Sequence, residues 1–280
     1  MFMEERAALT TTNNTIPPMG FGTYGGTGPE GIDALLFALE TGYRHLDTAQ
    51  SYGTERECGE ALRRSGLTRE EVFLTTKITG DNCRGGKLIR SLRQSNDSIG
   101  VDRVDLTLIH WSVSPTGKLP MAEYLAELAE AQTAGLTRLI GVSNFTIADV
   151  TEAEMMLGEG RIATNQFERH PLLQNQALVD FCRSRGIAVT CYLPLARGAC
   201  AGIPEIEAIA RSHDATVHQI ALAYSLNQGL IVIPTSGRRD RIAENFAAGA
   251  IQLSPAELER IGSLDRGARQ IDPPWSPAWD

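Results

Sequence analysis

The sequence has little lysine, no long apolar run and no closely spaced cysteine pair. Only three of the 26 basic residues are lysine, at positions 77, 87 and 118, so a lysine inside an apolar stretch marks a place where arginine would not serve. No run of 18 apolar residues occurs, which excludes a membrane-spanning helix. Acidic residues stand at positions 4 and 5, where a signal peptide would be basic, so we expect no secretory leader. The five cysteines form no Cys-x-x-Cys motif and are odd in number, which predicts reduced thiols and a cytoplasmic protein.

Composition and charge narrow the class of protein further. The 280 residues carry a net charge of −8, which argues against a nucleic-acid partner or an anionic membrane partner. Hydrophobic residues make up 42% and charged residues 21%, an ordinary globular mixture. No linker and no internal repeat interrupts the chain, and α/β barrels of about 200–250 residues commonly form one unit. We therefore expect a single domain over residues 1–280, and we expect the protein to be a monomer.

Short apolar runs alternate eight times with amphipathic stretches. We predict strands at residues 19–21, 44–46, 72–76, 104–109, 139–142, 162–165, 187–192 and 230–233. We predict helices at residues 29–41, 54–65, 87–99, 121–134, 147–157, 176–185, 204–226 with a break at 213–214, and 238–246. Strand followed by helix, eight times over, predicts an α/β protein with the (β/α)8 TIM-barrel fold.

Residues that end helices or form turns also agree with this fold. A glycine stands just before four of the predicted strands, where a helix ends with positive φ: Gly42, Gly66, Gly135 and Gly186. Residues 9–12 and 15–16 flank two asparagines and predict a short N-terminal hairpin that closes the barrel bottom. A further helix is expected from residue 254 to 264. Residues 272–280 form an irregular C-terminal tail with three prolines and two tryptophans.

Polar side chains recur where the predicted strands end. In a barrel of parallel strands these ends share one rim, which is where such barrels carry active sites. The second, third and fourth strands end at Asp47, Lys77 and His110, and Tyr52 follows Asp47 closely. The remaining strands add Ser143 with Asn144, Gln166, Tyr192, and Thr235 with Ser236. The sequence therefore predicts one polar site on one rim.

These four titratable groups suit proton-assisted reduction of a carbonyl. A tyrosine that donates a proton near neutral pH is expected to have its pKa lowered from about 10 by roughly 2–3 units. The ammonium of Lys77 would supply part of that shift, and Asp47 would keep Lys77 charged. His110 would hydrogen-bond the carbonyl oxygen and steer it toward Tyr52. The hydride itself must come from a cofactor.

Other interpretations of these residues stay open. Asp47 alone could cap a helix, Lys77 could extend its ammonium to solvent, and His110 could be a buried core histidine. Residues 20–25 match the Gly-x-Gly-x-x-Gly dinucleotide pattern, but no good buried strand precedes them, so we expect these glycines to let backbone approach a ligand. His213 and His218 are five apart and share no helix face, so we expect no metal site. His45 is expected to pack inside the barrel.

The chain resembles the aldo-keto reductases over essentially its whole length. The motifs that carry the resemblance are residues 42–49 with Tyr52, Thr76-Lys77, Leu108-Ile109-His110-Trp111, residues 141–145, residues 165–171, and residues 233–236 with 241–245. The short loop after Trp111 and the Trp-Asp ending most resemble the bacterial 2,5-diketo-gluconate and methylglyoxal reductases. The resemblance implies NADPH-dependent reduction of an aldehyde or ketone to an alcohol, with hydride from nicotinamide and a proton from Tyr52.

The resemblance also implies which residues bind. It implies the catalytic set Asp47, Tyr52, Lys77 and His110. It implies cofactor contacts from Gly22, Thr23, Ser143, Asn144, Gln166, Tyr192, Leu195, Thr235, Ser236, Arg238, Arg241, Glu244 and Asn245. The carbonyl substrate would meet Tyr24, Trp111, Trp275 and Trp279.

Two positions depart from the family pattern. Thr235 stands where lysine is common, so the preference for NADPH would depend on Arg241 and its neighbours. Ser112 replaces the usual proline after Trp111. An NAD-linked alcohol or sugar dehydrogenase, and a catalytically silent barrel that acts as a binding subunit, are the alternative functions.

Overall fold

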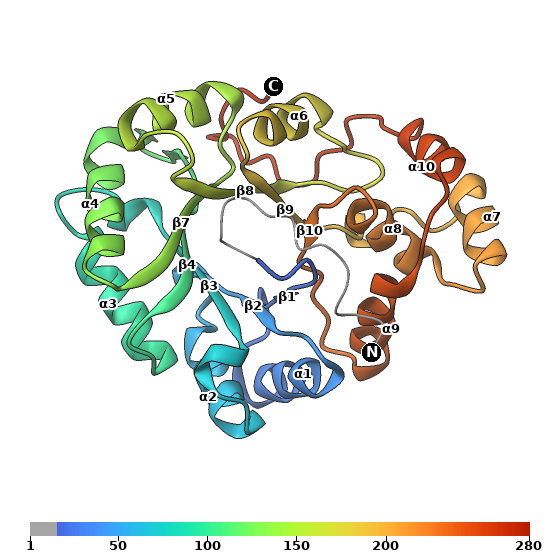
Figure 1. Ribbon diagram of the computed structural model, residues 1–280, viewed down its shortest axis with the longest axis horizontal. Coiled ribbons are helices and arrows are strands. Elements are labelled where there is room, and N and C mark those ends of the chain that lie inside the picture. Colours follow the sequence, from blue (N-terminus) through green and yellow to red (C-terminus); the bar gives the residue numbers. More distant parts are fainter. Residues whose placement is uncertain (1–15) are drawn as a thin grey trace.

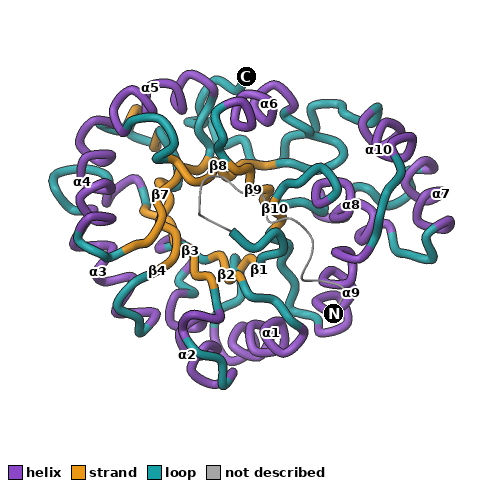
Figure 2. The backbone as a smooth tube through the Cα atoms, viewed as in Figure 1, coloured by secondary structure: helices purple, strands orange, loops and turns teal. Residues whose placement is uncertain are grey.

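The computed structural model describes residues 16–280. Eight parallel strands form a ring in the centre, and the helices surround it (Figures 1 and 2). In ring order the strands are β1 (Phe21–Gly22), β2 (His45–Asp47), β3 (Phe73–Ile78), β4 (Val104–Ile109), β7 (Thr137–Ser143), β8 (Ile162–Glu168), β9 (Ala188–Tyr192) and β10 (Ile231–Val232). The predicted (β/α)8 barrel is confirmed. The predicted N-terminal hairpin lies almost wholly outside the described residues.

The ring closes between its first and last strands. Met19 pairs with Val232 in a parallel bridge, and the backbone N–H of Gly22 donates to the carbonyl of Pro234 at 3.0 Å. Strands β1 and β10 are shorter than predicted, because only two residues of each pair with a neighbouring strand in the sheet. A closed ring leaves no free strand edge, which removes a route to aggregation.

Ten α-helices occur in residues 16–280. They are α1 (Gly28–Thr41), α2 (Glu55–Ser65), α3 (Leu88–Ile99), α4 (Met121–Thr133), α5 (Ile147–Leu157), α6 (Gln176–Ser184), α7 (Pro204–Ser212), α8 (Val217–Leu226), α9 (Arg239–Ala247) and α10 (Pro255–Gly262). The break predicted at residues 213–214 separates α7 from α8. The sequence did not reveal a small hairpin of β5 (Val113–Ser114) and β6 (Gly117–Lys118) in the loop after β4.

Local sequence explains where several helices begin and end. At α5, α8 and α10 the N-cap side chain accepts the backbone N–H of the third helical residue, whose side chain in turn accepts the N-cap N–H. The caps are Thr146, Thr216 and Ser254. All four glycines predicted to stop helices have positive φ, from 68° to 121°. These signals fix where the elements begin and end and so set the lengths of the connecting loops.

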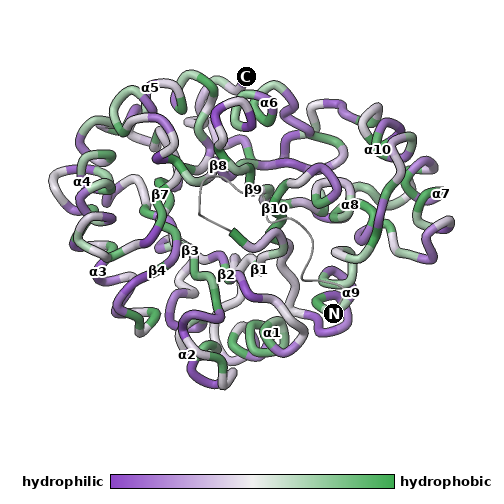
Figure 3. Tube along the Cα trace, in the orientation of Figure 1, coloured by the Kyte–Doolittle hydropathy of each residue, from purple (hydrophilic) through white to green (hydrophobic). Residues whose placement is uncertain are grey.

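The core has two layers because each strand presents alternate residues to opposite sides. Phe73, Leu106, Leu108 and Ile231 belong to a small cluster inside the ring, and a larger apolar cluster fills the space between ring and helices. Hydrophobic residues gather along the ring strands in Figure 3, while outer loops are largely hydrophilic. On β3 the inward side of Phe73 continues to Thr75 and Lys77, which brings the lysine to the top of the interior.

Two glycines of residues 20–25, Gly20 and Gly22, lie where the backbone packs closely against its neighbours, whereas Gly25 has φ 80° and open space around it. A Cβ on Gly20 would lie 2.7 Å from Nδ1 of His45, and one on Gly22 would lie 3.0 Å from the carbonyl oxygen of Ile233. Side chains at these positions would therefore push β1 away from both neighbours. His45 is buried and its Nε2 lies 2.9 Å from Oγ1 of Thr75, as expected of a packed barrel histidine.

Candidate functional site

The barrel brings the four predicted catalytic side chains together at one rim. Asp47 ends β2, Lys77 lies near the end of β3, and His110 directly follows β4. Tyr52 comes from a 3₁₀ turn (Gln50–Tyr52) in the loop after β2. Its ring centroid lies 5.6 Å from that of His110, and its hydroxyl lies 3.4 Å from Nζ of Lys77. Neighbouring parallel strands thus place residues that are 63 positions apart in one cluster.

The ammonium of Lys77 has an acceptor for each of its three protons. It donates to Oδ1 of Asp47, to the backbone carbonyl of Thr48 at 3.0 Å and to the Tyr52 hydroxyl. Lys77 and Asp47 are both buried. Burial alone would lower the pKa of Lys77, but the attraction of Asp47 and Tyr52 outweighs burial and raises that pKa. Lys77 therefore stays charged, as the sequence predicted.

The prediction of a lowered pKa for Tyr52 is wrong for the protein alone. Burial raises the pKa of Tyr52, and the opposing effect of Lys77 does not compensate for it. The sequence argument counted the charge beside the tyrosine but had no measure of its desolvation. Tyr52 is consequently protonated at neutral pH, with Lys77 beside its hydroxyl oxygen.

His110 is neutral at physiological pH. Burial, with a smaller contribution from Lys77, lowers the pKa of His110 to about 3. Oγ of Ser51 lies 3.5 Å from Nδ1 of the ring, and the backbone carbonyl of His110 accepts a hydrogen bond from Asn144 at 3.0 Å. A neutral imidazole carries one N–H, so His110 can donate one hydrogen bond without bringing a second positive charge near Lys77.

The residues predicted at the nicotinamide end form one hydrogen-bonded group. Oγ of Ser143 donates to the carbonyl of Gln166 at 2.9 Å, and the Tyr192 hydroxyl donates to Oδ1 of Asn144 at 2.8 Å. Nε2 of Gln166 donates to Oδ2 of Asp47 at 2.8 Å. The group is therefore joined to the four-residue cluster through a buried carboxylate. Among residues 16–280, Oε1 of Gln166 receives no hydrogen bond.

At the predicted adenosine end, the basic residues of α9 differ in what they contact. Arg238 is paired with Asp240, and the guanidinium of Arg239 lies 4.8 Å above the ring of Phe37. Arg241 is exposed, and within the described chain it has no hydrogen bond or ion pair from its side chain. An exposed guanidinium without an intramolecular partner can bind an anion.

The other residues predicted to contact the adenosine end of the cofactor differ in their exposure and in their hydrogen bonds. Thr235 is exposed, Ser236 accepts the N–H of Arg238 at 3.1 Å, and Asn245 is buried. Glu244 accepts the hydroxyl of Thr216 at 2.7 Å, so its carboxylate turns toward α8.

Three further predicted cofactor residues lie in loops or strands next to the cluster. Gly22 faces the segment that holds Thr235, whose Cβ lies 3.7 Å from the position of an added Cβ. Thr23 is buried, with its hydroxyl 2.7 Å from that of Thr54. Leu195 belongs to the loop after β9, where Leu193, Ala196 and Arg197 all have φ near 50°. Such strain in non-glycine residues is common near functional sites.

Aromatic residues surround the cluster on its outer side. Tyr24 is 71% exposed and packs edge-on against Tyr52 with centroids 5.2 Å apart. Trp275 and Trp279 of the tail contact Trp111 edge-on, at 5.0 Å and 6.0 Å. Because Trp111 follows His110 directly, the three tryptophans adjoin the cluster on the His110 side, and Tyr24 adjoins it on the Tyr52 side.

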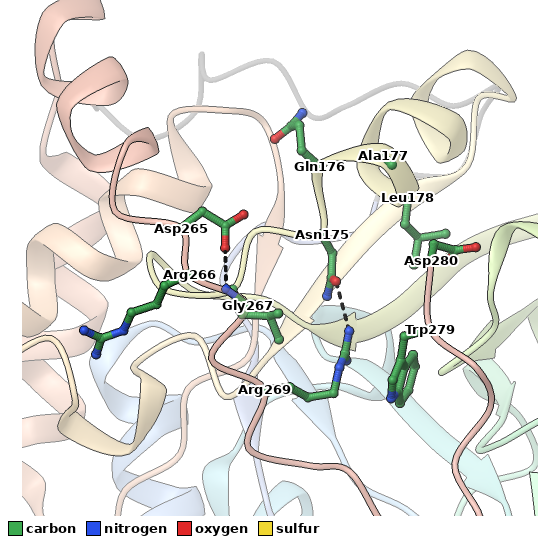
Figure 4. A pocket seen from close by; sticks show the side chains of 11 residues that line it. Asn175, Gln176, Ala177, Leu178, Asp265, Arg266, Gly267, Arg269, Trp279 and Asp280 are labelled. Carbon is green, nitrogen blue, oxygen red and sulfur yellow. Dashed lines mark hydrogen bonds between the residues drawn. The ribbon is translucent and has the colours of Figure 1, made fainter.

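A cavity of about 550 Å³ lies elsewhere, between the start of α6 and the tail (Figure 4). Its lining includes Asn175, Arg269 and Trp279, but none of the four clustered residues and none of the predicted cofactor residues.

Sequence reasoning missed Glu168 and Arg269. Glu168 is a fully buried carboxylate at the end of β8, and Arg269 lies 3.8 Å above the ring of Trp279. A carboxylate at the end of a strand whose residues are all buried is what marks Glu168, but burial is visible only in the structure. Arg269 had no signal in the sequence either, because its partners come from distant segments. Ser112, the departure after Trp111, is buried and donates to Asp149 at 2.9 Å, which ties the β4 loop to α5.

Comparison with known proteins gives consistent matches. The model of the aldo/keto reductase family matches residues 18–266. The methylglyoxal reductase DkgB of Yersinia pestis is 44% identical over 267 residues, covering 95% of this chain and 100% of the relative. A 9,11-endoperoxide prostaglandin H2 reductase of Trypanosoma cruzi is 34% identical, covering 92% of each chain. A solved structure named for 2,5-diketo-D-gluconic acid reductase B superposes with a TM-score of 0.91 at 38% identity, covering 95% of each chain.

Proposed function

The chain belongs to the aldo/keto reductase family, and we propose that it uses NADPH, with Tyr52 as the proton donor, to reduce small aldehydes and ketones. Membership makes the protein an oxidoreductase that converts a carbonyl group to an alcohol with a nicotinamide cofactor. The observation that supports the site assignment is the cluster of Asp47, Tyr52, Lys77 and His110. Asp47 and Lys77 are buried. Tyr52 and His110 are half-buried, and Tyr52 packs edge-on against the exposed ring of Tyr24.

Tyr52 donates the proton, and Lys77 stabilises the charge that Tyr52 then carries. Reduced nicotinamide, when bound, supplies the hydride. As the carbonyl oxygen gains negative charge, the Tyr52 O–H donates its proton to that oxygen. Lys77 lies 3.4 Å from the phenol oxygen and stabilises the negative charge that Tyr52 acquires on losing the proton. A raised pKa suits this task, because the donor remains protonated until the alkoxide forms.

His110 orients the substrate. Its neutral ring, with a pKa near 3, can donate an N–H to the carbonyl oxygen. Its position beside Tyr52 brings that oxygen within reach of the phenol, since the two ring centroids are 5.6 Å apart. Two hydrogen-bond donors then converge on one oxygen, which is how developing alkoxides are stabilised.

Donors and acceptors at the rim fit the cofactor. Oε1 of Gln166 has no partner in residues 16–280 and would accept from a carboxamide N–H. Ser143 and Asn144 lie beside it, and Tyr192 offers a half-buried ring for stacking. At the far end, Arg241 would hold the 2′-phosphate that distinguishes NADPH from NADH.

The substrate is a small molecule with a carbonyl group, and we propose small to mid-sized aldehydes and ketones. The rings of Tyr24, Trp111, Trp275 and Trp279 adjoin the cluster and would contact the substrate, which favours partly apolar substrates. Methylglyoxal is the first candidate, because it names the activity of a relative that is 44% identical.

We further propose that residues 1–280 form one domain that acts as a cytoplasmic monomer without a nucleic-acid partner. Five free, buried thiols and a net charge of −8 support this proposal. None of the helices in residues 16–280 has the length and apolar character needed to cross a bilayer.

A turnover assay tests the proposed function. Purified protein would be given methylglyoxal and a panel of aldehydes with NADPH or with NADH, and oxidation of the cofactor would be followed. We expect turnover with higher kcat/KM for NADPH. Tyr52→Phe should lower kcat by at least ~10², the loss expected on removing a general acid, with NADPH affinity nearly unchanged.

Three results would contradict the proposal. Binding of NADPH without turnover of any aldehyde would support the silent barrel. Equal or better use of NADH would support the NAD-linked dehydrogenase. Near-normal turnover by Tyr52→Phe would remove the tyrosine from its role.

A further inference from the structure

Glu168 ends β8 as a fully buried carboxylate that is satisfied without an arginine or lysine. Its Oε1 accepts the backbone N–H of Gln270 at 2.8 Å and Nε2–H of His170 at 3.0 Å. Its Oε2 accepts the backbone N–H of Ile271 at 2.7 Å. A buried anion is costly unless it is hydrogen-bonded, and bonds to a charged acceptor are about twice as strong as neutral ones. Two of its three donors belong to residues 265–280, the whole irregular C-terminal segment, which we call the tail from this point.

The tail has no regular structure of its own, so contacts with other segments hold it in place. Besides the bonds to Glu168, the N–H of Ile147 donates to Asp280 at 3.0 Å and Nε2 of Gln270 donates to the carbonyl of Ala196 at 2.9 Å. Residues 265–280 contain no helix or strand. The N–H groups of Gln270 and Ile271 are therefore satisfied by a side chain more than 100 positions earlier in the chain. Irregular surface backbone without such bonds is the part of a protein that opens most readily.

A second connection runs from Glu168 to the tail through Asn175. The backbone carbonyl of Glu168 accepts from Nδ2 of Asn175 at 2.7 Å, and Oδ1 of Asn175 accepts from Arg269 at 3.0 Å. The guanidinium of Arg269 lies 3.8 Å above the ring of Trp279. Figure 4 shows Arg269 between Asn175 and Trp279, with the hydrogen bond to Asn175 dashed.

The second connection leads to the tryptophans that contact Trp111. Trp279 also donates its indole N–H to Asp272 at 2.9 Å, and both Trp275 and Trp279 contact Trp111. Trp111 follows His110, so a shift of the tail would change the wall next to the reacting carbonyl. Glu168 itself has no hydrogen bond to any of the four clustered residues among residues 16–280.

We propose that Glu168 is a positioning residue that anchors the C-terminal tail and thereby sets selectivity for bulky carbonyl substrates. The substrate part of this proposal rests on the proposed function. Glu168 stands two residues after Gln166 on β8, and it pairs in register with Tyr192 of β9. The substrate wall is thus fixed to the same strands that carry two predicted nicotinamide contacts. A bulky substrate needs the wall in place, whereas a small one such as methylglyoxal needs only the residues around Tyr52.

Tryptophan fluorescence tests the anchoring without any catalysis. All three tryptophans of the chain, at positions 111, 275 and 279, belong to this wall, so the whole emission reports on it. In Glu168→Gln the amide N–H₂ replaces one acceptor and faces a tail N–H. We expect a red-shifted emission and faster quenching by acrylamide. Glu154→Gln is the matched control, since Glu154 is also a buried carboxylate but contacts Arg185 rather than the tail.

Steady-state kinetics test the selectivity. We expect KM for 4-nitrobenzaldehyde to rise ~10-fold in Glu168→Gln, the ratio that loss of one charge-assisted hydrogen bond produces, with kcat little changed. KM for methylglyoxal should change little. The ratio of kcat/KM for the two aldehydes is the quantity to compare, because a general loss of folded enzyme would cancel in it.

A variant in the tail tests the same hydrogen bond without changing Glu168. Ile271→Pro removes the N–H that donates to Oε2 of Glu168 while leaving Glu168 in place. Ile271→Ala removes the side chain and retains the N–H. The proline variant should reproduce the red shift and the altered ratio, and the alanine variant should do so much less.

Each outcome bears on the proposal. Unchanged emission in both Glu168→Gln and Ile271→Pro would overturn the anchoring. Red-shifted emission with equal losses for both aldehydes would overturn the selectivity, because Glu168 would then act through Tyr192 and the cofactor. If the unmodified protein reduces neither aldehyde, the proposed function fails, and the fluorescence comparison still decides whether Glu168 anchors the tail.

Discussion

Two titratable residues of the site respond differently to the same surroundings. Lys77 is buried yet charged, because Asp47, Thr48 and Tyr52 each accept one of its protons. Tyr52 is buried too, but Lys77 alone cannot offset its desolvation, so its pKa rises. Acid strength in this site is therefore set by how many partners each group has as well as by their charge.

The lowered pKa of His110 predicts acid sensitivity. The folded pKa is about 3, whereas an unfolded histidine titrates near 6.5. Below about pH 6.5 the unfolded chain binds a proton that the folded protein does not, so stability falls as pH drops toward 3. His110→Gln should make this loss shallower between pH 6.5 and 4, measured as melting temperature against pH.

His45 also has a lowered pKa and contributes to the slope in both proteins, so the comparison isolates His110. Parallel curves for the native protein and His110→Gln would show that His110 binds its proton equally well in both states.

At the scale of single elements, we predict that the start of α9 sets the preference for NADPH over NADH. Arg238 forms an ion pair with Asp240, and Arg239 lies over the ring of Phe37. Arg241 is therefore the arginine of this segment that is available to bind the 2′-phosphate. We expect Arg241→Ala to remove most of the preference for NADPH over NADH, a ratio of roughly 10- to 150-fold for a bond of about 1.5–3 kcal/mol. The ratio of kcat/KM for the two cofactors is the measurement.

Two further variants of this segment serve as comparisons. Arg238→Ala should leave the ratio nearly unchanged, and Thr235→Lys should raise it. A larger effect from Arg238 than from Arg241 would reverse the assignment.

Helices α2 and α3 meet at a glycine. An added Cβ on Gly59 would lie 2.0 Å from the backbone carbonyl oxygen of Ile99, closer than any real contact. Gly59→Ala should destabilise the protein by about 1–3 kcal/mol through overpacking, despite the better helix propensity of alanine. Urea unfolding measures the change. Gly237→Ala, where a Cβ has no neighbour within 4 Å, should be near neutral, and equal effects would argue against this contact.

At the scale of the whole molecule, burial protects every cysteine. Burial raises the pKa of Cys58, Cys83 and Cys182 to about 12, and that of Cys191 and Cys200 to about 11. Because the thiolate is the reactive form, we expect no thiol to react quickly with a disulfide reagent in the native protein at pH 8. All five should react in denaturant. Fast labelling of a native thiol would reveal a local opening that exposes it.

The sequence by itself determined the eight strand–helix units, the glycine stops and the rim positions of Asp47, Lys77 and His110. These depend on local patterns: strand alternation, helix capping, and the rule that parallel strand ends share a rim. The resemblance extended this to binding roles for the remaining site residues. The positions of these residues in the barrel agree with the prediction, and their roles stay predictions.

Only the tertiary structure decided the direction of the Tyr52 pKa, the packing role of Gly20, and the anchoring of the tail by Glu168. Each depends on contacts between segments that are far apart in the chain. Desolvation of Tyr52 is the sum of many neighbours, Gly20 meets a histidine 25 positions later, and Glu168 binds N–H groups about 100 positions away. A local sequence pattern does not identify such partners, because the segments come into contact only when the chain has folded into the barrel.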